Sequence, residues 1–208
     1  MILLKKIAGF ISLLLLIITA SIAIVILFTP LYHFSAWYHD IPERLNMSYD
    51  TLIDNYYVLL RYLHFPWIQE LNLPDFPSSE SGLFHFWEVK ILFYINYGVL
   101  VISALASYVY IRYVKQNRLF WTLQKPFFAA SLVPPILLML LAINFDRMFV
   151  IFHELFFNND AWLFNPATDP IILALPQEFF MYCFILFFIL IEASFIFGYR
   201  YSKKNAFK

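Results

Sequence analysis

Four long apolar runs limit what this chain can fold into more than any other feature. They cover residues 7–29, 91–112, 126–145 and 177–199. Each run is long enough to cross a hydrocarbon core of about 30 Å, which takes about 20 residues at the helical rise. In lipid the backbone must satisfy its own hydrogen bonds, so such runs fold as helices. The sequence therefore predicts an all-α membrane protein with four transmembrane helices.

The composition supports this prediction, because hydrophobic residues make up 62% of the 208 residues and charged residues only 13%. A soluble domain carries about a quarter charged residues. The first run follows Lys5 and Lys6 as a secretory signal does, but it exceeds a signal core of about 7–15 residues, so we expect a retained span. We predict a single integral membrane domain over residues 1–208, surrounded by membrane lipid and without a nucleic-acid partner.

The basic residues divide between the loops in a way that predicts orientation. Ten of the fourteen lie at the two ends of the chain or around the link 113–125, and four lie elsewhere. The positive-inside rule then places both termini in the cytoplasm. Thirteen of the fourteen acidic residues and all five histidines fall on the opposite side. The segments 30–90 and 146–176 are expected to form an extracytoplasmic cap of interfacial helices and loops.

Local signals predict helices in the first cap segment. Ser48 is a suitable N-cap for a helix that lies in the membrane interface. Another helix is expected to begin near Ser79 or Ser81 and to run unbroken to about Tyr113. That helix is longer than a crossing needs, so its first turns should project to the surface or line a cleft.

The third span and the second cap segment also carry local signals. Pro134-Pro135 predicts a kink in the third span. Asn144 can cap a helix over residues 145–157.

Two histidines of the cap occur in patterns that suit proton transfer. His85 and Glu88 lie three residues apart on one helical face, so the carboxylate can hydrogen-bond the imidazole. His153 and Glu154 lie in an aromatic stretch, where a histidine is costly to bury without a partner. The alternative for each histidine is a packed, hydrogen-bonded structural role. The residues alone leave both interpretations open.

Other kinds of catalysis have no clear pattern in the sequence. A second histidine does not follow His153 four residues later, so zinc-protease spacing is missing, although ligands from different helices can still converge. We therefore assign no metal site and no cofactor. Cys183 is the one cysteine and cannot form an internal disulfide. We interpret it as a packing or lipid-facing residue.

The stretch from Phe149 to Phe180 resembles the lipoprotein intramolecular transacylase family of bacterial membrane proteins. Its motifs here are Asp146-Arg147, His153, Phe156-Phe157-x-Asn159-Asp160-x-Trp162, Thr168-Asp169 and Pro176-x-x-Phe179-Phe180. A second match is His85-x-x-Glu88-Val89-Lys90, where family members often carry aspartate at the Glu88 position. Asn55-Tyr56 and Tyr62-Leu63 fit more loosely. The Asn-Asp-x-Trp block is the specific part of the resemblance.

The resemblance implies an acyltransferase of the bacterial cell membrane that acts on diacylglyceryl-modified lipoproteins. The acyl chain on the glycerol sn-2 oxygen would move to the α-amino group of the N-terminal lipidated cysteine, leaving the lyso-form. The site would face the outer leaflet, where the charge distribution places both histidines. We assign His85 and His153 as the acid–base pair, with imidazoles within about 10 Å of each other. The residues assigned to orientation, oxyanion binding or substrate binding are Glu88, Lys90, Asp146, Arg147, Glu154, Asn159, Asp160, Trp162 and Asp169.

Two other functions remain open on the residues alone. The first is a non-catalytic membrane protein that binds lipid or quinone or scaffolds a partner, in which the two histidines need not be close. The second is a metal-dependent membrane lipid hydrolase, which requires three or more ligands converging on one point.

Overall fold

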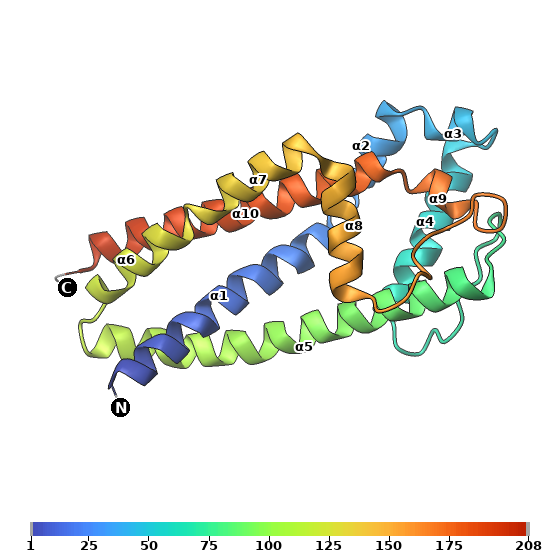
Figure 1. Ribbon diagram of the computed structural model, residues 1–208. Coiled ribbons are helices and arrows are strands. Elements are labelled where there is room, and N and C mark those ends of the chain that lie inside the picture. The colour runs from blue at the N-terminus through green and yellow to red at the C-terminus, as the bar shows by residue number, and fades with distance from the viewer. Residues whose placement is uncertain (1, 207–208) are drawn as a thin grey trace. The chain divides into compact units, whose positions relative to one another are not determined.

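The computed structural model describes residues 2–206, and every regular element within that range is a helix (Figure 1). The helices in chain order are α1 (Ile2–Leu27), α2 (Pro30–Tyr38), α3 (Ile41–Arg44), α4 (Tyr49–His64), α5 (Glu80–Gln116), α6 (Trp121–Ala130), α7 (Val133–Ile143), α8 (Phe145–Phe156), α9 (Ile171–Ala174) and α10 (Gln177–Lys204). The chain divides into two compact units. Unit 1 consists of Met1–Leu27, Asn96–Asn144 and Phe184–Lys208, and unit 2 of Phe28–Ile95 and Phe145–Cys183.

Four helical segments within residues 2–206 are long and apolar enough to cross a membrane. They are Leu4–Leu27, Glu80–Gln116, Trp121–Ile143 and Gln177–Lys204. The predicted fold class is therefore confirmed. The helices extend beyond the apolar runs because their flanking polar turns are helical as well. The third segment, for example, begins at Trp121, five residues before the predicted start.

The third membrane-crossing segment is interrupted near Pro134-Pro135, as predicted. α6 ends at Ala130, and Ser131 and Leu132 form a turn before α7. A proline has no N–H with which to donate to the carbonyl four residues earlier. Pro134 and Pro135 thus leave the carbonyl groups of Ala130 and Ser131 without their helical donors.

Unit 1 packs around a cluster of apolar side chains from α1, α5, α6, the link before α6, and α10. Its buried members are Leu13, Tyr110, Val114, Phe120, Leu123, Phe127, Ile191 and Phe195. α1 approaches α5 closely at Gly9, where an added Cβ would lie 2.1 Å from the Tyr110 ring. The missing side chain therefore makes room for the tyrosine, which is the usual reason for small residues between membrane helices.

We expect Gly9→Ala to lower the thermal unfolding temperature, because the Tyr110 ring must move to admit the new methyl group. Overpacking of this kind costs about 1–3 kcal/mol of stability. Gly98→Ala on α5 is the matched control, because no described atom outside its own helical turns lies within 4 Å of its added Cβ. Alanine is favoured over glycine in a helix by about 1 kcal/mol, so this variant should unfold at an equal or higher temperature. Equal losses in both variants, measured on protein in the same detergent, would contradict the close approach.

Unit 2 has its own core, centred on Tyr32 of α2. The Tyr32 hydroxyl donates a hydrogen bond to the backbone oxygen of Ala174, at 2.9 Å. Its ring stacks on Tyr56 of α4 at a centroid distance of 3.8 Å and meets Phe179 of α10 edge to face at 5.2 Å. One buried side chain thus joins α2, α4, α9 and the first turn of α10.

α4 begins where the sequence predicts, since Ser48 Oγ accepts the N–H of Thr51 at 3.0 Å. Asn55 on its buried face bonds Asp75 twice, donating to Oδ2 at 2.7 Å and accepting from the backbone N–H at 3.2 Å. The pair ties the irregular chain that follows α4 back onto the helix. The position of α4 at a membrane interface stays a prediction.

Candidate active site

The two predicted acid–base residues lie next to each other in unit 2. His85 is on the second turn of α5 and His153 on the last turn of α8, and their ring centroids are 6.0 Å apart. The predicted proximity is therefore confirmed. Both side chains are buried, with 7% and 9% of their surface exposed. The first turns of α5 were predicted to project to the surface or to line a cleft; Trp87 is exposed, whereas His85 is buried.

Aromatic rings from the chain after α8 surround the histidines. Phe157 and Phe164 meet the His85 ring edge to face at 4.7 and 5.4 Å. Trp162 stacks on His153 at 4.7 Å, with an interplanar angle of 26°. These rings exclude water from the imidazoles and fix their planes.

His153 has a defined hydrogen-bond partner and hence a defined tautomer. Its Nδ1 lies 2.7 Å from the backbone oxygen of Phe149, one turn earlier in α8. A carbonyl oxygen only accepts, so Nδ1 carries the hydrogen of the neutral ring and Nε2 holds the lone pair. Burial lowers the pKa of His153 below its ordinary value, and the bond to Phe149 offsets part of this effect. The neutral form, which can accept a proton at Nε2, is therefore favoured.

Glu88 bonds Asn159 in place of the predicted partner, His85. Glu88 Oε1 accepts from Asn159 Nδ2 at 2.8 Å, and Asn159 Oδ1 accepts the N–H of Ala161 at 2.9 Å. The bond fixes to α5 the turn that precedes Trp162, whose ring stacks on His153. The second carboxylate oxygen, Oε2, is buried and has no hydrogen-bond partner among residues 2–206. A carboxylate in that state stabilises positive charge nearby, and His85 lies on the same helical face.

Asp169 holds the start of the helix that carries His85. It is 3% exposed and accepts the backbone N–H of Ser79 at 2.8 Å, the Ser79 hydroxyl at 2.8 Å and the Thr168 hydroxyl at 2.7 Å. Burial acts to raise the pKa of Asp169, but these hydrogen bonds outweigh it and lower the pKa below its ordinary value. Ser79 Oγ in turn accepts the N–H of Gly82 at 3.0 Å, which caps α5. Asp169 therefore positions α5 and does not bond to the imidazoles.

Lys90, predicted as an oxyanion ligand, contacts a different part of unit 2. Its ammonium group donates to the backbone oxygen of Ile68 and lies 4.2 Å from the centre of the Tyr62 ring. Lys90 follows His85 by five positions in α5, which places it about 140° around the helix axis from the histidine. By these contacts Lys90 anchors the chain after α4.

The remaining predicted residues lie at the surface of unit 2. Asp146 accepts from Gln177 Nε2 at 3.0 Å and joins the first turn of α8 to that of α10. Arg147, Glu154 and Asp160 are exposed, so they do not share the buried surroundings of the histidine pair.

Two other histidines of unit 2, His33 and His39, bond to tyrosines. His33 lies 2.7 Å from the Tyr49 hydroxyl and 3.2 Å from that of Tyr57, and His39 lies 3.0 Å from that of Tyr182. Within residues 2–206 no three His, Cys, Asp or Glu side chains converge in a way that could hold a metal ion. A metal-dependent hydrolase therefore has no ligand set in the described part of the chain.

Sequence reasoning missed Phe157 and Phe164 as neighbours of His85, and Ser79 and Gly82 as neighbours of Asp169. Gly82 carried a usable signal, because a glycine inside a helical pattern often marks a close approach. An added Cβ there would lie 2.2 Å from Asp169 Oδ1.

Comparisons with known proteins agree with the resemblance read from the sequence. The family model of the lipoprotein intramolecular transacylase Lit matches residues 7–180. The chain is similar to the solved structure of the membrane-integral lipoprotein intramolecular transacylase Lit from Bacillus cereus, with 31% identity and a TM-score of 0.86 over 97% of this chain and 95% of that one. A structure of the B. cereus protein with a histidine-to-arginine mutation gives 29% identity and a TM-score of 0.83 over 97% and 90%. No curated protein sequence gave a match.

Proposed function

This chain belongs to the lipoprotein intramolecular transacylase family, and on that premise we propose that it moves the acyl chain on the glycerol sn-2 oxygen of a diacylated lipoprotein to the α-amino group of the N-terminal lipidated cysteine. The observation that carries the proposal is the buried pair of His85 and His153, with ring centroids 6.0 Å apart. That separation suits a small reacting group held between two proton-transfer partners.

The reaction needs no enzyme nucleophile, because both reacting groups belong to one substrate. Attack of the amine nitrogen on the acyl carbon closes an eight-membered ring through Cα, Cβ, sulfur, two glycerol carbons and the ester oxygen. The new C–N bond forms, the bond from the acyl carbon to the glycerol oxygen breaks, and the proton lost by nitrogen is balanced by the one gained by oxygen. The protein must hold the ring-closing conformation and move that proton.

The two imidazoles suit different halves of the proton transfer. His153, with its lone pair on Nε2, accepts the proton from the amine. His85 donates a hydrogen bond to the acyl oxygen as negative charge develops there, and the proton taken up by His153 then passes through His85 to the departing glycerol oxygen, so that both rings end neutral. Burial opposes charge on both rings at once, so a single shared proton matches the balance of the reaction. The unpartnered oxygen of Glu88 favours the imidazolium that forms in between.

Exposed apolar side chains near each histidine in the sequence supply a surface for the substrate's acyl chains. Phe84 and Trp87 on α5 are 46% and 50% exposed, and their rings stack at 5.8 Å. Leu155 and Phe156 on α8 are 75% and 49% exposed. Lipid tails gain from contact with such side chains, which water would otherwise surround.

The direct test is mass spectrometry of one lipoprotein's N-terminal peptide, from cells with and without this protein. Intramolecular transfer leaves the mass of the lipopeptide unchanged, while fragmentation moves one acyl chain from the glycerol to the nitrogen. The new amide should also survive mild alkali, which removes ester-linked chains. A hydrolase would instead shorten the lipopeptide by one acyl chain, and a non-catalytic lipid- or quinone-binding protein would change nothing. Either of those results would overturn the proposal.

We further propose that the histidine pair acts at the outer leaflet and that both termini are cytoplasmic. The support is the charge asymmetry of the sequence: ten of fourteen basic residues lie at the chain ends or near the 113–125 link. In a Cys183→Ser background, single cysteines replacing the exposed residues Gln69 and Asn165 should react with an impermeant thiol reagent on intact cells. Cysteines replacing Asn117 and Lys204 should react only after lysis, and the reverse pattern would invert the topology.

A further inference from the structure

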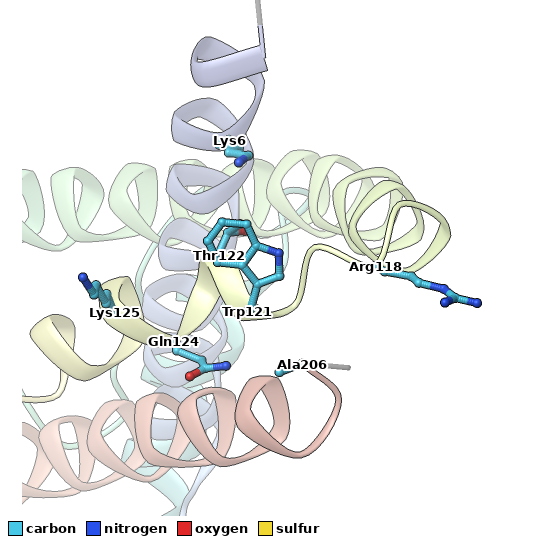
Figure 2. A pocket seen from close by; sticks show the side chains of 7 residues that line it. All are labelled: Lys6, Arg118, Trp121, Thr122, Gln124, Lys125 and Ala206. Atoms are coloured by element: carbon cyan, nitrogen blue, oxygen red, sulfur yellow. The ribbon is translucent and has the colours of Figure 1, made fainter. Parts of the chain in front are cut away.

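A cavity of about 880 Å³ lies in unit 1, and basic side chains from three elements line it. Lys6 comes from α1, Arg118 from the link between α5 and α6, and Lys125 from α6. Trp121 stands between them, with Arg118 and Lys125 on opposite sides and the Lys6 amine above the indole (Figure 2). The Lys6 ammonium lies 5.4 Å from the centre of the Trp121 ring, within reach of a cation–π interaction.

No carboxylate compensates these cations among the described residues that line the cavity. The segments of unit 1 contain ten basic residues and one acidic residue, Glu192, which lies in the middle of α10. Cations gathered in this way repel one another. A ligand with negative charge would remove that repulsion.

Arg118 occupies a backbone position that favours glycine. Its φ is +55°, in the left-handed region. It follows the end of α5, where the N–H of Arg118 bonds the oxygen of Lys115 and the N–H of Leu119 bonds that of Val114. That pattern is the usual helix ending with glycine at the left-handed residue. An arginine there is less favourable for the backbone, which indicates that its side chain has a use of its own.

The surroundings of the cavity distinguish a lipid from a soluble anion. Trp121 and Phe128 lie seven residues apart on one face of α6, and both are 55% exposed. Lys125 lies between them on the same face. The basic group thus continues directly into exposed apolar surface on a membrane-crossing segment, the arrangement that a charged headgroup and its acyl chains require.

From these observations we infer that the cavity formed by Lys6, Arg118, Trp121 and Lys125 binds the phosphate-bearing headgroup of an anionic phospholipid. The site lies in unit 1, contains none of the residues of the histidine pair, and does not depend on the acyl-transfer reaction. Its cations bond the phosphate, Trp121 stacks at headgroup level, and the apolar face of α6 receives an acyl chain.

Native mass spectrometry of the full-length protein in detergent tests the inference, with phosphatidylglycerol and phosphatidylcholine of identical acyl chains as probes. The wild type should retain phosphatidylglycerol about tenfold better. The triple variant Lys6→Gln/Arg118→Gly/Lys125→Gln should lose this preference. The control Lys115→Gln/Lys203→Gln/Lys204→Gln removes three exposed charges that do not line the cavity and should keep it.

Arg118→Gly alone separates binding from folding, because glycine suits the left-handed backbone. This variant should unfold at the same or a higher temperature without lipid, yet bind phosphatidylglycerol more weakly than the wild type. Equal loss in the control triple variant would show a general charge effect and overturn the site. Glycerol 3-phosphate or inorganic phosphate that displaces the lipid and stabilises the protein equally well would show a soluble-anion site and overturn the lipid assignment.

Discussion

His153→Gln lowers the rate of N-acyl lyso-form production by about 10²–10⁴-fold, the usual contribution of a positioned acid or base. Glutamine keeps a side-chain N–H near the Phe149 oxygen that His153 now bonds, but it offers no lone pair able to accept the substrate's proton. His85→Gln should cause a loss of the same order, since the second ring lies 6.0 Å away on the path of the same proton. The measurement is fragmentation mass spectrometry of lipoprotein peptides, scaled to the amount of protein in the membrane.

Thermal unfolding of each variant is part of that experiment, because both histidines are buried among aromatic rings. His33→Ala is the histidine control: its ring bonds Tyr49 and Tyr57, and it should retain near-normal activity. Cys183→Ser should also remain active, because a ring-closing transfer passes no acyl group through the enzyme. Normal product from a well-folded His153 variant, or an inactive but stable Cys183→Ser protein, would rule out direct transfer by this pair.

Asp169→Ala destabilises the protein by about 2–4 kcal/mol and reduces transfer as well. The buried carboxylate accepts three hydrogen bonds, and bonds to charged acceptors contribute about 1.5–3 kcal/mol each before partial replacement by water. Its loss leaves the Ser79 N–H without a partner at the start of α5, so the helix end that carries His85 loosens. For a chain of this size the unfolding temperature should fall by about 5–10 °C.

Asp54→Ala provides the control, because Asp54 is an exposed aspartate on α4 and its loss should be nearly neutral. The stability difference between wild type and Asp169→Ala should also depend on pH. Since folding lowers the pKa of Asp169, its stabilisation is complete above the unfolded value of about 3.9 and disappears as the pH falls through the lower folded value. A difference that persists unchanged in strong acid would assign the effect to packing instead of charge.

The parts of the fold that local sequence encodes were predicted well. The four spans follow from apolar length, the start of α4 from the capping hydroxyl of Ser48, and the interruption before α7 from Pro134-Pro135. The start of α8 at Phe145 was also predicted, and only its end differs, by one residue. Each of these features depends on residues within a few positions of one another, so a single sequence carries the information.

The candidate site depended on the family resemblance, because its contacts join distant segments. Glu88 meets Asn159 across 71 residues, and Ser79 meets Asp169 across 90. The three-residue spacing of His85 and Glu88 predicted a hydrogen bond between these two side chains. Glu88 instead accepts a hydrogen bond from the side-chain amide of Asn159. No local pattern indicated that His85 is buried, because the two rings that cover it, Phe157 and Phe164, come from the chain after α8.

The interruption between α6 and α7 has a mechanical consequence. A continuous helix resists bending through its ladder of backbone hydrogen bonds, and α1, α5 and α10 keep theirs along their full described length. At Ser131 and Leu132 the ladder stops, and the two prolines that follow cannot restore it. The third membrane segment therefore bends most easily at this one turn. α6 and α7 stay stiff on either side of it and change their angle to each other there. Changes in bilayer thickness would be absorbed there at lower energy than in the three unbroken spans.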